Sequence, residues 1–216
     1  MRVERIPAWV TGTNCYVVTS DDNHAVLIDA PPEPDLIGRH LAEMDVAVIG
    51  ILLTHGHVDH TGGAGKLAAQ SGAITYVHPD DDFLTLHPTE QLERIFGVVP
   101  PGSYETPDTF ESLRHGQLLD VGGVRFEVRH TPGHTPGHCC FFVEDEGVLF
   151  SGDQLFAGSI GRYDLPGGSF QQLVASMREQ VMTLADDVEV LPGHGPETTI
   201  GRERATNPFR AEWTDS

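Results

Sequence analysis

The sequence predicts one α/β domain in which two β-sheets pack face to face and helices cover the outside. Three observations support this fold class. Strand-like runs alternate with helix-like segments early in the chain, hairpin-like runs dominate from residue 117 onward, and both halves contain helical segments. The 216 residues suffice for one domain with a substantial core, and no stretch has the composition of a linker. We therefore expect residues 1–216 to form a single domain.

The first half of the chain predicts strands that alternate with helices. Strand-like runs occupy residues 15–20, 25–30, 46–54 and 74–78, and helix-like segments occupy residues 35–43 and 65–71. The run 46–54 is continuously aliphatic and β-branched, which predicts a strand buried on both faces. Residues 80–107 mix helix signals with several prolines, and we expect them to form an excursion over the surface.

The second half predicts a series of hairpins followed by helices. Strand-like runs occupy residues 118–121, 124–130, 138–145 and 147–153, and Gly122-Gly123 supplies the first turn. A loop rich in Gly and Pro is expected at 157–169, before a helix at 170–184, a strand at 188–194 and a last helix at 200–205.

The composition excludes several classes of partner. The formal net charge of −19 argues against nucleic acid and anionic membranes, because both are polyanions that need a basic surface. No stretch approaches the roughly 18 apolar residues of a membrane span, and the start MRVERIPAWV lacks the apolar core of a signal peptide. We therefore expect a cytoplasmic protein. Cys15, Cys139 and Cys140 form no disulfide framework and are interpreted as buried thiols.

The strongest chemical signal lies at the end of the predicted strand 46–54, where His55, His57, Asp59 and His60 fall within six residues. Imidazole nitrogens and carboxylate oxygens are ligands that first-row transition metals share. At a spacing of two, His55 and His57 can point to one side of an extended segment. Asp59 and His60 can point to an adjacent position after the chain turns. The alternative is a polar loop in which Asp59 caps the following helix.

Three isolated residues later in the chain have similar positions. Each lies in a turn marked by Gly or Pro, after or near a strand-like run. They are His134 in HTPGHTPGH, Asp153 in LFSGDQLF and His194 in VLPGHGP. Each alone is a weak signal, since a single histidine in a turn is more often a surface residue. Together with the first cluster they predict a metal centre that is built from distant parts of the chain.

The remaining histidines and loop motifs carry weaker signals. His130 and His138 flank His134 and are expected to be structural, with a role in orienting ligands as the alternative. The segment TGGAGK lacks the spacing of a phosphate-binding loop, and no Gly-x-Ser-x-Gly motif supports covalent catalysis. The other histidines lack companions and are interpreted as surface or core residues: His24, His40, His78, His87 and His115.

The chain resembles the metallo-β-lactamase superfamily, whose His-x-His-x-Asp-His signature is present as residues 55–60. Within it, the chain is most similar to the short bacterial members of the glyoxalase II group, the hydroxyacylglutathione hydrolases. The supporting segments are TNCYVV, HTPGHTPG, LFSGDQLFAGSIGRYDLPGG and LPGHGPETTIGRERATNPF. The resemblance covers nearly the whole chain. It implies an αββα sandwich, with two mixed β-sheets flanked by helices and a metal site at one edge.

The resemblance also implies a ligand set for two divalent metal ions, with Zn²⁺ as the expected metal and Fe or Mn as alternatives. Asp59 is expected to orient the nucleophile as well, which makes it the candidate catalytic residue. The implied ligands are His55, His57 and His134 for the first ion, Asp59, His60 and His194 for the second, and Asp153 as the bridge.

The activity implied by the resemblance is hydrolysis of a small thioester, such as S-D-lactoylglutathione, to a hydroxy acid and a free thiol by a metal-bound hydroxide. Two features depart from the group. Only nine residues follow Asn207, so we expect no separate carboxyl-terminal helical domain that grips the thiol. Arg162 occupies the place of a basic residue that contacts the thiol cofactor, but an arginine so close to Asp164 can equally form a structural ion pair.

Three other functions are kept as alternatives. The first is a persulfide dioxygenase with one Fe(II), for which His55, His134 and Asp153 would form the two-histidine, one-carboxylate triad. The second is another small ester, lactone or β-lactam hydrolase with the same centre. The third is a non-catalytic metal-binding module. The sequence gives no indication of the oligomeric state.

Overall fold

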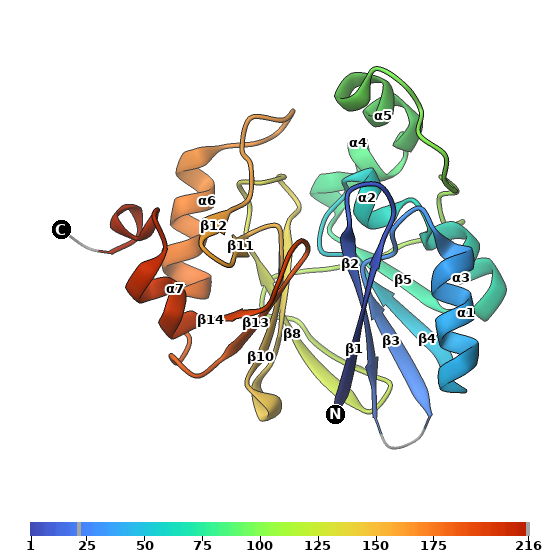
Figure 1. The fold of residues 1–216 in the computed structure, drawn as a ribbon, viewed down its shortest axis with the longest axis horizontal. Coiled ribbons are helices and arrows are strands. Elements are labelled where there is room, and N and C mark those ends of the chain that lie inside the picture. Colours follow the sequence, from blue (N-terminus) through green and yellow to red (C-terminus); the bar gives the residue numbers. More distant parts are fainter. Residues whose placement is uncertain (21–22, 215–216) are drawn as a thin grey trace.

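The computed structural model describes residues 1–20 and 23–214, and within them two six-stranded sheets pack face to face with helices outside (Figure 1). The amino-terminal half of the chain forms one sheet and the carboxyl-terminal half forms the other. Both sheets are mixed, because each contains parallel and antiparallel pairs. The predicted αββα sandwich of two mixed sheets flanked by helices is confirmed.

The first sheet joins an antiparallel meander to a parallel α/β segment. Its strands, in spatial order, are β1 (Arg2–Ala8), β2 (Thr13–Thr19), β3 (His24–Ile28), β4 (Ala47–Leu52), β5 (Ile74–Val77) and β6 (Glu111–Ser112). Strands β3 to β6 are parallel. Helices α1 (Pro34–Met44) and α3 (Ala64–Ser71) cover the outer face, where buried Ile37 and Leu67 belong to one cluster with Leu27 and Leu53. This explains why residues 46–54 read as apolar on both faces.

The second sheet is mostly antiparallel and contains one parallel pair of strands. Its strands, in spatial order, are β14 (Thr198–Thr199), β13 (Glu189–Pro192), β10 (Val148–Gly152), β9 (Cys139–Val143), β8 (Val124–His130) and β7 (Leu118–Val121). Helix α6 (Phe170–Ser176), its π-helical extension (Met177–Val181) and helix α7 (Ile200–Thr206) cover the outer face. Ser169 caps α6 by accepting a hydrogen bond from the backbone N–H of Gln172.

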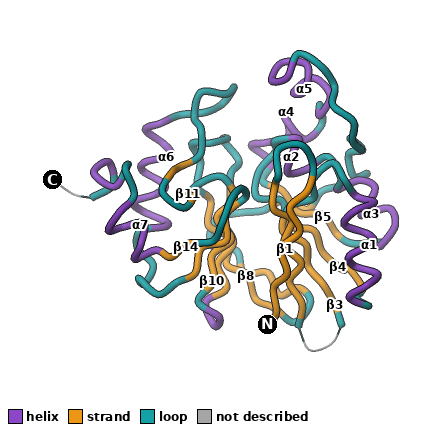
Figure 2. Tube along the Cα trace, in the orientation of Figure 1, coloured by secondary structure: helices purple, strands orange, loops and turns teal. Residues whose placement is uncertain are grey.

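The core between the sheets combines aromatic residues of the second sheet with aliphatic residues and Tyr16 of the first. Phe126, Phe141 and Phe150 of the second sheet are fully buried against residues such as Val26 and Leu52 of the first. Burial of one such side chain contributes roughly 1.5–3 kcal/mol, so the interface between the sheets holds their relative position. Figure 2 shows the strands in the middle, the helices on both sides and many of the longer loops gathered at one edge.

The structure contains elements that the sequence patterns did not predict. Strand β1 was missed because Pro7 and three charged residues obscure its alternation, and a proline is tolerated there because β1 lies at the edge of the sheet. The excursion at 80–107 contains helices α4 (Asp82–Thr85) and α5 (Pro88–Phe96). The expected loop 157–169 overlaps the small hairpin of β11 (Leu155–Phe156) and β12 (Ser159–Ile160). No helix among the described residues is long and apolar enough to span a bilayer.

Candidate metal centre

The predicted ligands come from four places in the chain that meet at one edge of the sandwich. The turn after β4 carries His55 and His57, and the short helix α2 (Val58–Thr61) carries Asp59 and His60. The remaining three follow strands of the second sheet, namely His134 after β8, Asp153 after β10 and His194 after β13. The structure therefore brings all seven predicted residues together.

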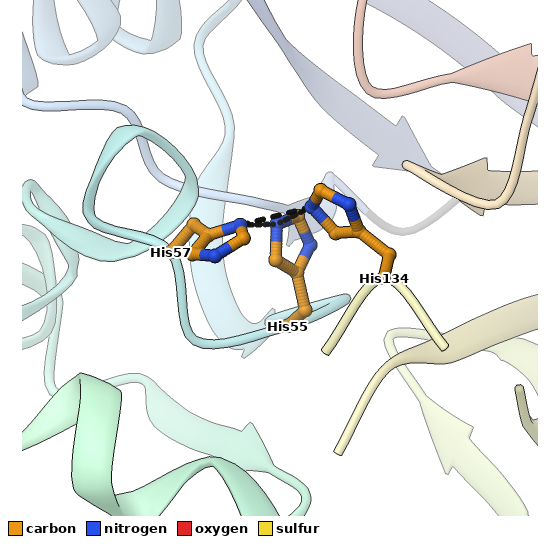
Figure 3. A group of neighbouring side chains, drawn as sticks. All are labelled: His55, His57 and His134. Atoms are coloured by element: carbon orange, nitrogen blue, oxygen red, sulfur yellow. Dashed lines mark hydrogen bonds between the residues drawn. The ribbon is translucent and has the colours of Figure 1, made fainter. Parts of the chain in front are cut away.

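Three histidines form the most buried part of this cluster (Figure 3). The distances between ring nitrogens are 3.1 Å from His55 Nε2 to His57 Nδ1, 2.9 Å from His57 Nδ1 to His134 Nε2, and 3.2 Å from His134 Nε2 to His55 Nε2. The ring planes lie at 83–87° to one another, so their edges rather than their faces meet. Burial lowers the pKa of all three below 6.5, which leaves neutral imidazoles with lone pairs free for a metal.

The second group combines two histidines with a carboxylate. His60 Nε2 lies 3.2 Å from His194 Nε2, and Asp59 Oδ2 lies 3.6 Å and 3.3 Å from these two nitrogens. Burial opposes a charge on His60, but the carboxylates of Asp59, Asp153 and Asp29 raise its pKa to about 10. The negative potential that favours a proton at this nitrogen also favours a metal cation.

Asp153 lies between the two groups. Its Oδ1 is 3.4 Å from His60 Nε2, and its Oδ2 is 3.5 Å from His134 Nε2 and 3.6 Å from His194 Nε2. Although Oδ1 is buried, it accepts no hydrogen bond within residues 1–20 and 23–214. A buried carboxylate oxygen without a donor is costly unless a cation compensates it. These donors therefore fit two divalent ions, one for each group of ligands, with Asp153 between them.

Two buried residues, Asp29 and His138, orient candidate ligands through hydrogen bonds. The Asp29 carboxylate accepts a hydrogen bond from His60 Nδ1 at 2.7 Å and another from the Thr54 backbone N–H at 2.7 Å, so His60 presents Nε2 to the centre. His138 Nε2 accepts a hydrogen bond from the Asp153 backbone N–H at 3.0 Å. His138 thus has the orienting role that was the alternative interpretation, whereas Asp29 gave no sequence signal beyond its position after a strand.

Asp81 connects the two turns that carry the three histidines. Its buried carboxylate accepts hydrogen bonds from the Gly56 N–H at 2.7 Å, the Thr135 hydroxyl at 2.7 Å and the Gly137 N–H at 2.6 Å. Gly56 separates two of the histidines, and Thr135 follows His134. Asp81 therefore fixes the separation of these turns. In the acidic run PDDD, the sequence does not distinguish it from a surface carboxylate.

The remaining histidines lie outside the seven-residue cluster. His78, Asp80 and His130 form a separate group of potential ligands. The rings of His78 and His130 are stacked at 4.1 Å with an angle of 5° between their planes. Parallel rings direct their nitrogen lone pairs side by side rather than toward a shared point, so this pair is a packing arrangement. Cys15, Cys139 and Cys140 are buried and unpaired, as expected.

A cleft opens over the candidate centre, and the hairpin β11–β12 forms one wall with Phe156 and Ile160. Arg162 also lines the cleft. Its guanidinium makes two contacts of 2.9 Å with the carboxylate of Asp164, so the ion pair considered from the sequence is present. The Arg162 backbone carbonyl accepts a hydrogen bond from His134 Nδ1 at 2.6 Å, which leaves His134 Nε2 facing the centre.

The segment 198–207, near the carboxyl terminus, supports the wall of the cleft that the hairpin β11–β12 forms. Buried Glu203 accepts hydrogen bonds from the Gly158 N–H at 2.9 Å, the Thr198 hydroxyl at 2.6 Å and Asn207 Nδ2 at 2.7 Å. Asn207 Nδ2 also donates to the Ser159 carbonyl at 3.1 Å. The segment TTIGRERATN therefore anchors the tip of the hairpin β11–β12.

Comparison with known proteins agrees with this architecture. The model of the metallo-beta-lactamase superfamily matches residues 8–194. Hydroxyacylglutathione hydrolase GloC of Haemophilus influenzae is 38% identical over 210 residues, which cover 97% of this chain and 98% of that protein.

Among solved structures, BLEG-1 B3 metallo-beta-lactamase has a TM-score of 0.90 and 35% identity, with 97% of this chain and 99% of that chain covered. TTHA1623 in a di-iron-bound form has a TM-score of 0.85 and 36% identity, with 96% and 100% covered. ETHE1 from Myxococcus xanthus has a TM-score of 0.77 and 26% identity, with 99% and 88% covered.

Proposed function

The chain belongs to the metallo-beta-lactamase superfamily, and we propose that it is a metal-dependent hydrolase that cleaves a small thioester into a hydroxy acid and a free thiol. The observation that carries the proposal is the position of Asp153 between two complete groups of buried ligands. The likeness to GloC supports a thioester such as S-D-lactoylglutathione as the substrate. The net charge of −19 supports a small molecule rather than nucleic acid or a membrane surface, and we propose a cytoplasmic location.

In this proposal His55, His57 and His134 would hold the first ion, Asp59, His60 and His194 would hold the second, and Asp153 would be shared between them. When bound, such ions supply Lewis acidity toward the substrate carbonyl and lower the pKa of water to about 7. We propose Zn²⁺, and the di-iron form of TTHA1623 makes iron the main alternative.

The residues of the chain have distinct roles in this scheme. Asp59 Oδ2 accepts a hydrogen bond from the Thr13 hydroxyl at 3.0 Å and lines the cleft, so it is placed to orient an attacking water. Asp29 and the Arg162 carbonyl hold His60 and His134 in the tautomers that present Nε2. No strong general acid is required for the departing thiolate, because the pKa of a thiol is only about 8.5. An acidic substrate group that binds Arg162 must compete with Asp164.

The second candidate function is hydrolysis of a β-lactam or lactone, which the likeness to BLEG-1 B3 metallo-beta-lactamase favours. The same Lewis-acid chemistry serves a strained amide or ester carbonyl. A persulfide dioxygenase with one Fe(II) at His55, His134 and Asp153 is less well supported, because the second group of ligands is complete in this chain.

Metal analysis of the purified protein, combined with a substrate panel, tests these functions. We expect two divalent ions per chain and thiol release from S-D-lactoylglutathione, with little hydrolysis of a β-lactam or a lactone. One iron per chain with oxygen uptake on glutathione persulfide would establish the dioxygenase instead. Two bound ions with no turnover of any substrate would favour the non-catalytic module.

A further inference from the structure

A second groove adjoins the cleft over the metal centre. Its lining includes Phe83 and Leu84 of α4, Arg94 of α5, and Leu165 and Pro166 of the loop after β12. His57 and Leu165 line both this groove and the cleft, so the two spaces are neighbours. In Figure 1 the helices α4 and α5 rise at the edge of the molecule where the loop after β12 also lies.

Four of the residues that line the groove are apolar, namely Phe83, Leu84, Leu165 and Pro166, and the others are polar or charged. Phe83 is 47% exposed although it is a large aromatic residue. A Cβ atom placed on Gly167 would lie 3.3 Å from the tip of the Phe83 ring, so the loop after β12 and α4 nearly touch there. The apolar side chains of the groove favour a hydrocarbon segment, because they lose contact with water when the groove is filled.

The groove is attached directly to the metal-binding turn through Gln91 of α5. Its side-chain NH₂ group donates to the Gly56 carbonyl at 3.0 Å and to the Leu84 carbonyl at 2.8 Å, and its Oε1 accepts from the Val58 N–H at 3.1 Å. Gln91 is buried and all these contacts are internal, so it holds the helices against the turn and is not available to a ligand. The groove and the centre thus keep a fixed relative position.

Two charged residues line the groove, the cation Arg94 and the carboxylate Glu90. Arg94 makes no ion pair or side-chain hydrogen bond with any residue that the structure describes. The Glu90 carboxylate lies 3.4 Å from Nδ1 of His87, the residue before α5. The Arg94 guanidinium is therefore free to meet an anionic group that enters the groove, and planar guanidinium suits a carboxylate.

We propose that this groove binds an apolar arm of the substrate that ends in a carboxylate, with Arg94 as the residue that contacts the carboxylate. The inference rests on the proposed thioester hydrolysis and extends it to a substrate class: thioesters in which a short hydrocarbon chain separates the reactive carbonyl from a terminal carboxylate. The carboxylate can belong to the acyl part or to the thiol part, and both satisfy the same chemistry.

Kinetics on paired thioesters test the proposal. One pair places the carboxylate on the acyl side, as the adipoyl thioester of mercaptoethanol, and the other on the thiol side, as S-acetyl mercaptohexanoate. Each is compared with its terminal amide. We expect a lower KM for the carboxylate form in at least one pair. Arg94→Gln should raise that KM about three- to fivefold, as for a partly exposed ion pair, and leave kcat and the KM of the amide unchanged.

Two further variants separate the groove from general effects. Arg114→Gln removes another exposed arginine, located after β6, and should leave every KM unchanged. Phe83→Ala should raise the KM of carboxylate and amide forms together, by about fivefold, because it removes an apolar wall. Direct titration with hexanoate should show binding to the metal-loaded protein that Arg94→Gln weakens and Arg114→Gln does not.

The outcomes distinguish this inference from the proposed function. No thiol release from any thioester, S-D-lactoylglutathione included, contradicts the proposed function. Release from S-D-lactoylglutathione alone, or equal KM values for carboxylate and amide forms, contradicts the groove assignment and leaves the hydrolase intact. A KM preference for the carboxylate that survives Arg94→Gln unchanged also overturns the role of Arg94.

Discussion

The molecule contains two clusters of histidines that differ in the direction of their ring nitrogens. In the candidate metal centre, His55, His57 and His134 meet edge to edge, and each pair has nitrogens within 3.2 Å. In the other cluster, His78 and His130 stack face to face with nearly parallel planes. Both clusters have an aspartate nearby. The comparison teaches that residue type and proximity do not define a metal site, whereas the convergence of lone pairs does.

The change with the largest expected effect removes the residue between the two groups of ligands. Asp153→Ala should reduce turnover to background and lower the metal content below two ions per chain, because both groups lose their shared carboxylate. Metal analysis and thiol release measured on the same preparation check both effects. Full activity with two retained ions would show that Asp153 does not bridge.

Asp81→Asn should weaken metal binding about ten- to a hundredfold, as expected when a residue that orients ligands is altered. The amide NH₂ replaces one acceptor oxygen of the carboxylate. Asn therefore loses either the hydrogen bonds from Gly56 and Thr135, which share Oδ2, or the one from Gly137 at Oδ1, and the two turns are held less firmly. Competition with a chelator measures the affinity. Asp82→Asn is the matched control, since Asp82 is the exposed neighbour, and equal affinities for the two variants would refute the role of Asp81.

Substitutions in the stacked pair should leave the metal centre intact. His78→Ala removes one ring of the stack, and we expect the free energy of unfolding to fall by about 1 kcal/mol. The number of bound ions should stay the same, and excess Zn²⁺ should add no further ion to the unaltered protein. Calorimetric metal titration together with denaturant unfolding provides the check. Loss of one ion in His78→Ala would erase the distinction between the clusters.

The smallest expected effect is a pH dependence of stability that arises from the same pair. Burial, followed by the neighbouring His130, lowers the pKa of His78 below 6.5. The unfolded chain then takes up a proton more readily than the folded protein as the pH falls below 6.5, so this contribution to stability is lost on acidification. Unfolding midpoints of the unaltered protein and of His78→Phe, compared above and below pH 6.5, should show a weaker dependence in the variant. Identical slopes would contradict this assignment.

The sequence predicts the ligand positions better than it predicts their supports. His134, Asp153 and His194 were identifiable because each lies in a turn marked by Gly or Pro after or near a strand-like run, where side chains from different strands meet. Asp29 and Asp81 gave no comparable signal, because an isolated or clustered aspartate is usually a solvated surface residue and only the tertiary structure buries it.

The sequence likewise predicts some elements of secondary structure and misses others. The aliphatic run 46–54 predicted a buried strand because it is long and uninterrupted, and β4 forms there. Strand β1 was not predicted, because its sequence has no clear alternation of apolar and polar residues. Alternate burial of its side chains arises only when the strand pairs with β2. Helices α4 and α5 are short and depend on contacts such as those of Gln91, so local patterns within 80–107 could not define the groove that they form.

The anchoring of the hairpin β11–β12 by Glu203 and Asn207 bears on the order in which the protein matures during synthesis. The last candidate ligand, His194, leaves the ribosome before either of these two residues. A nascent chain can therefore present every candidate ligand while the cleft wall still lacks its tether. Translation of this molecule completes the candidate ligands before it completes the support of the cleft wall.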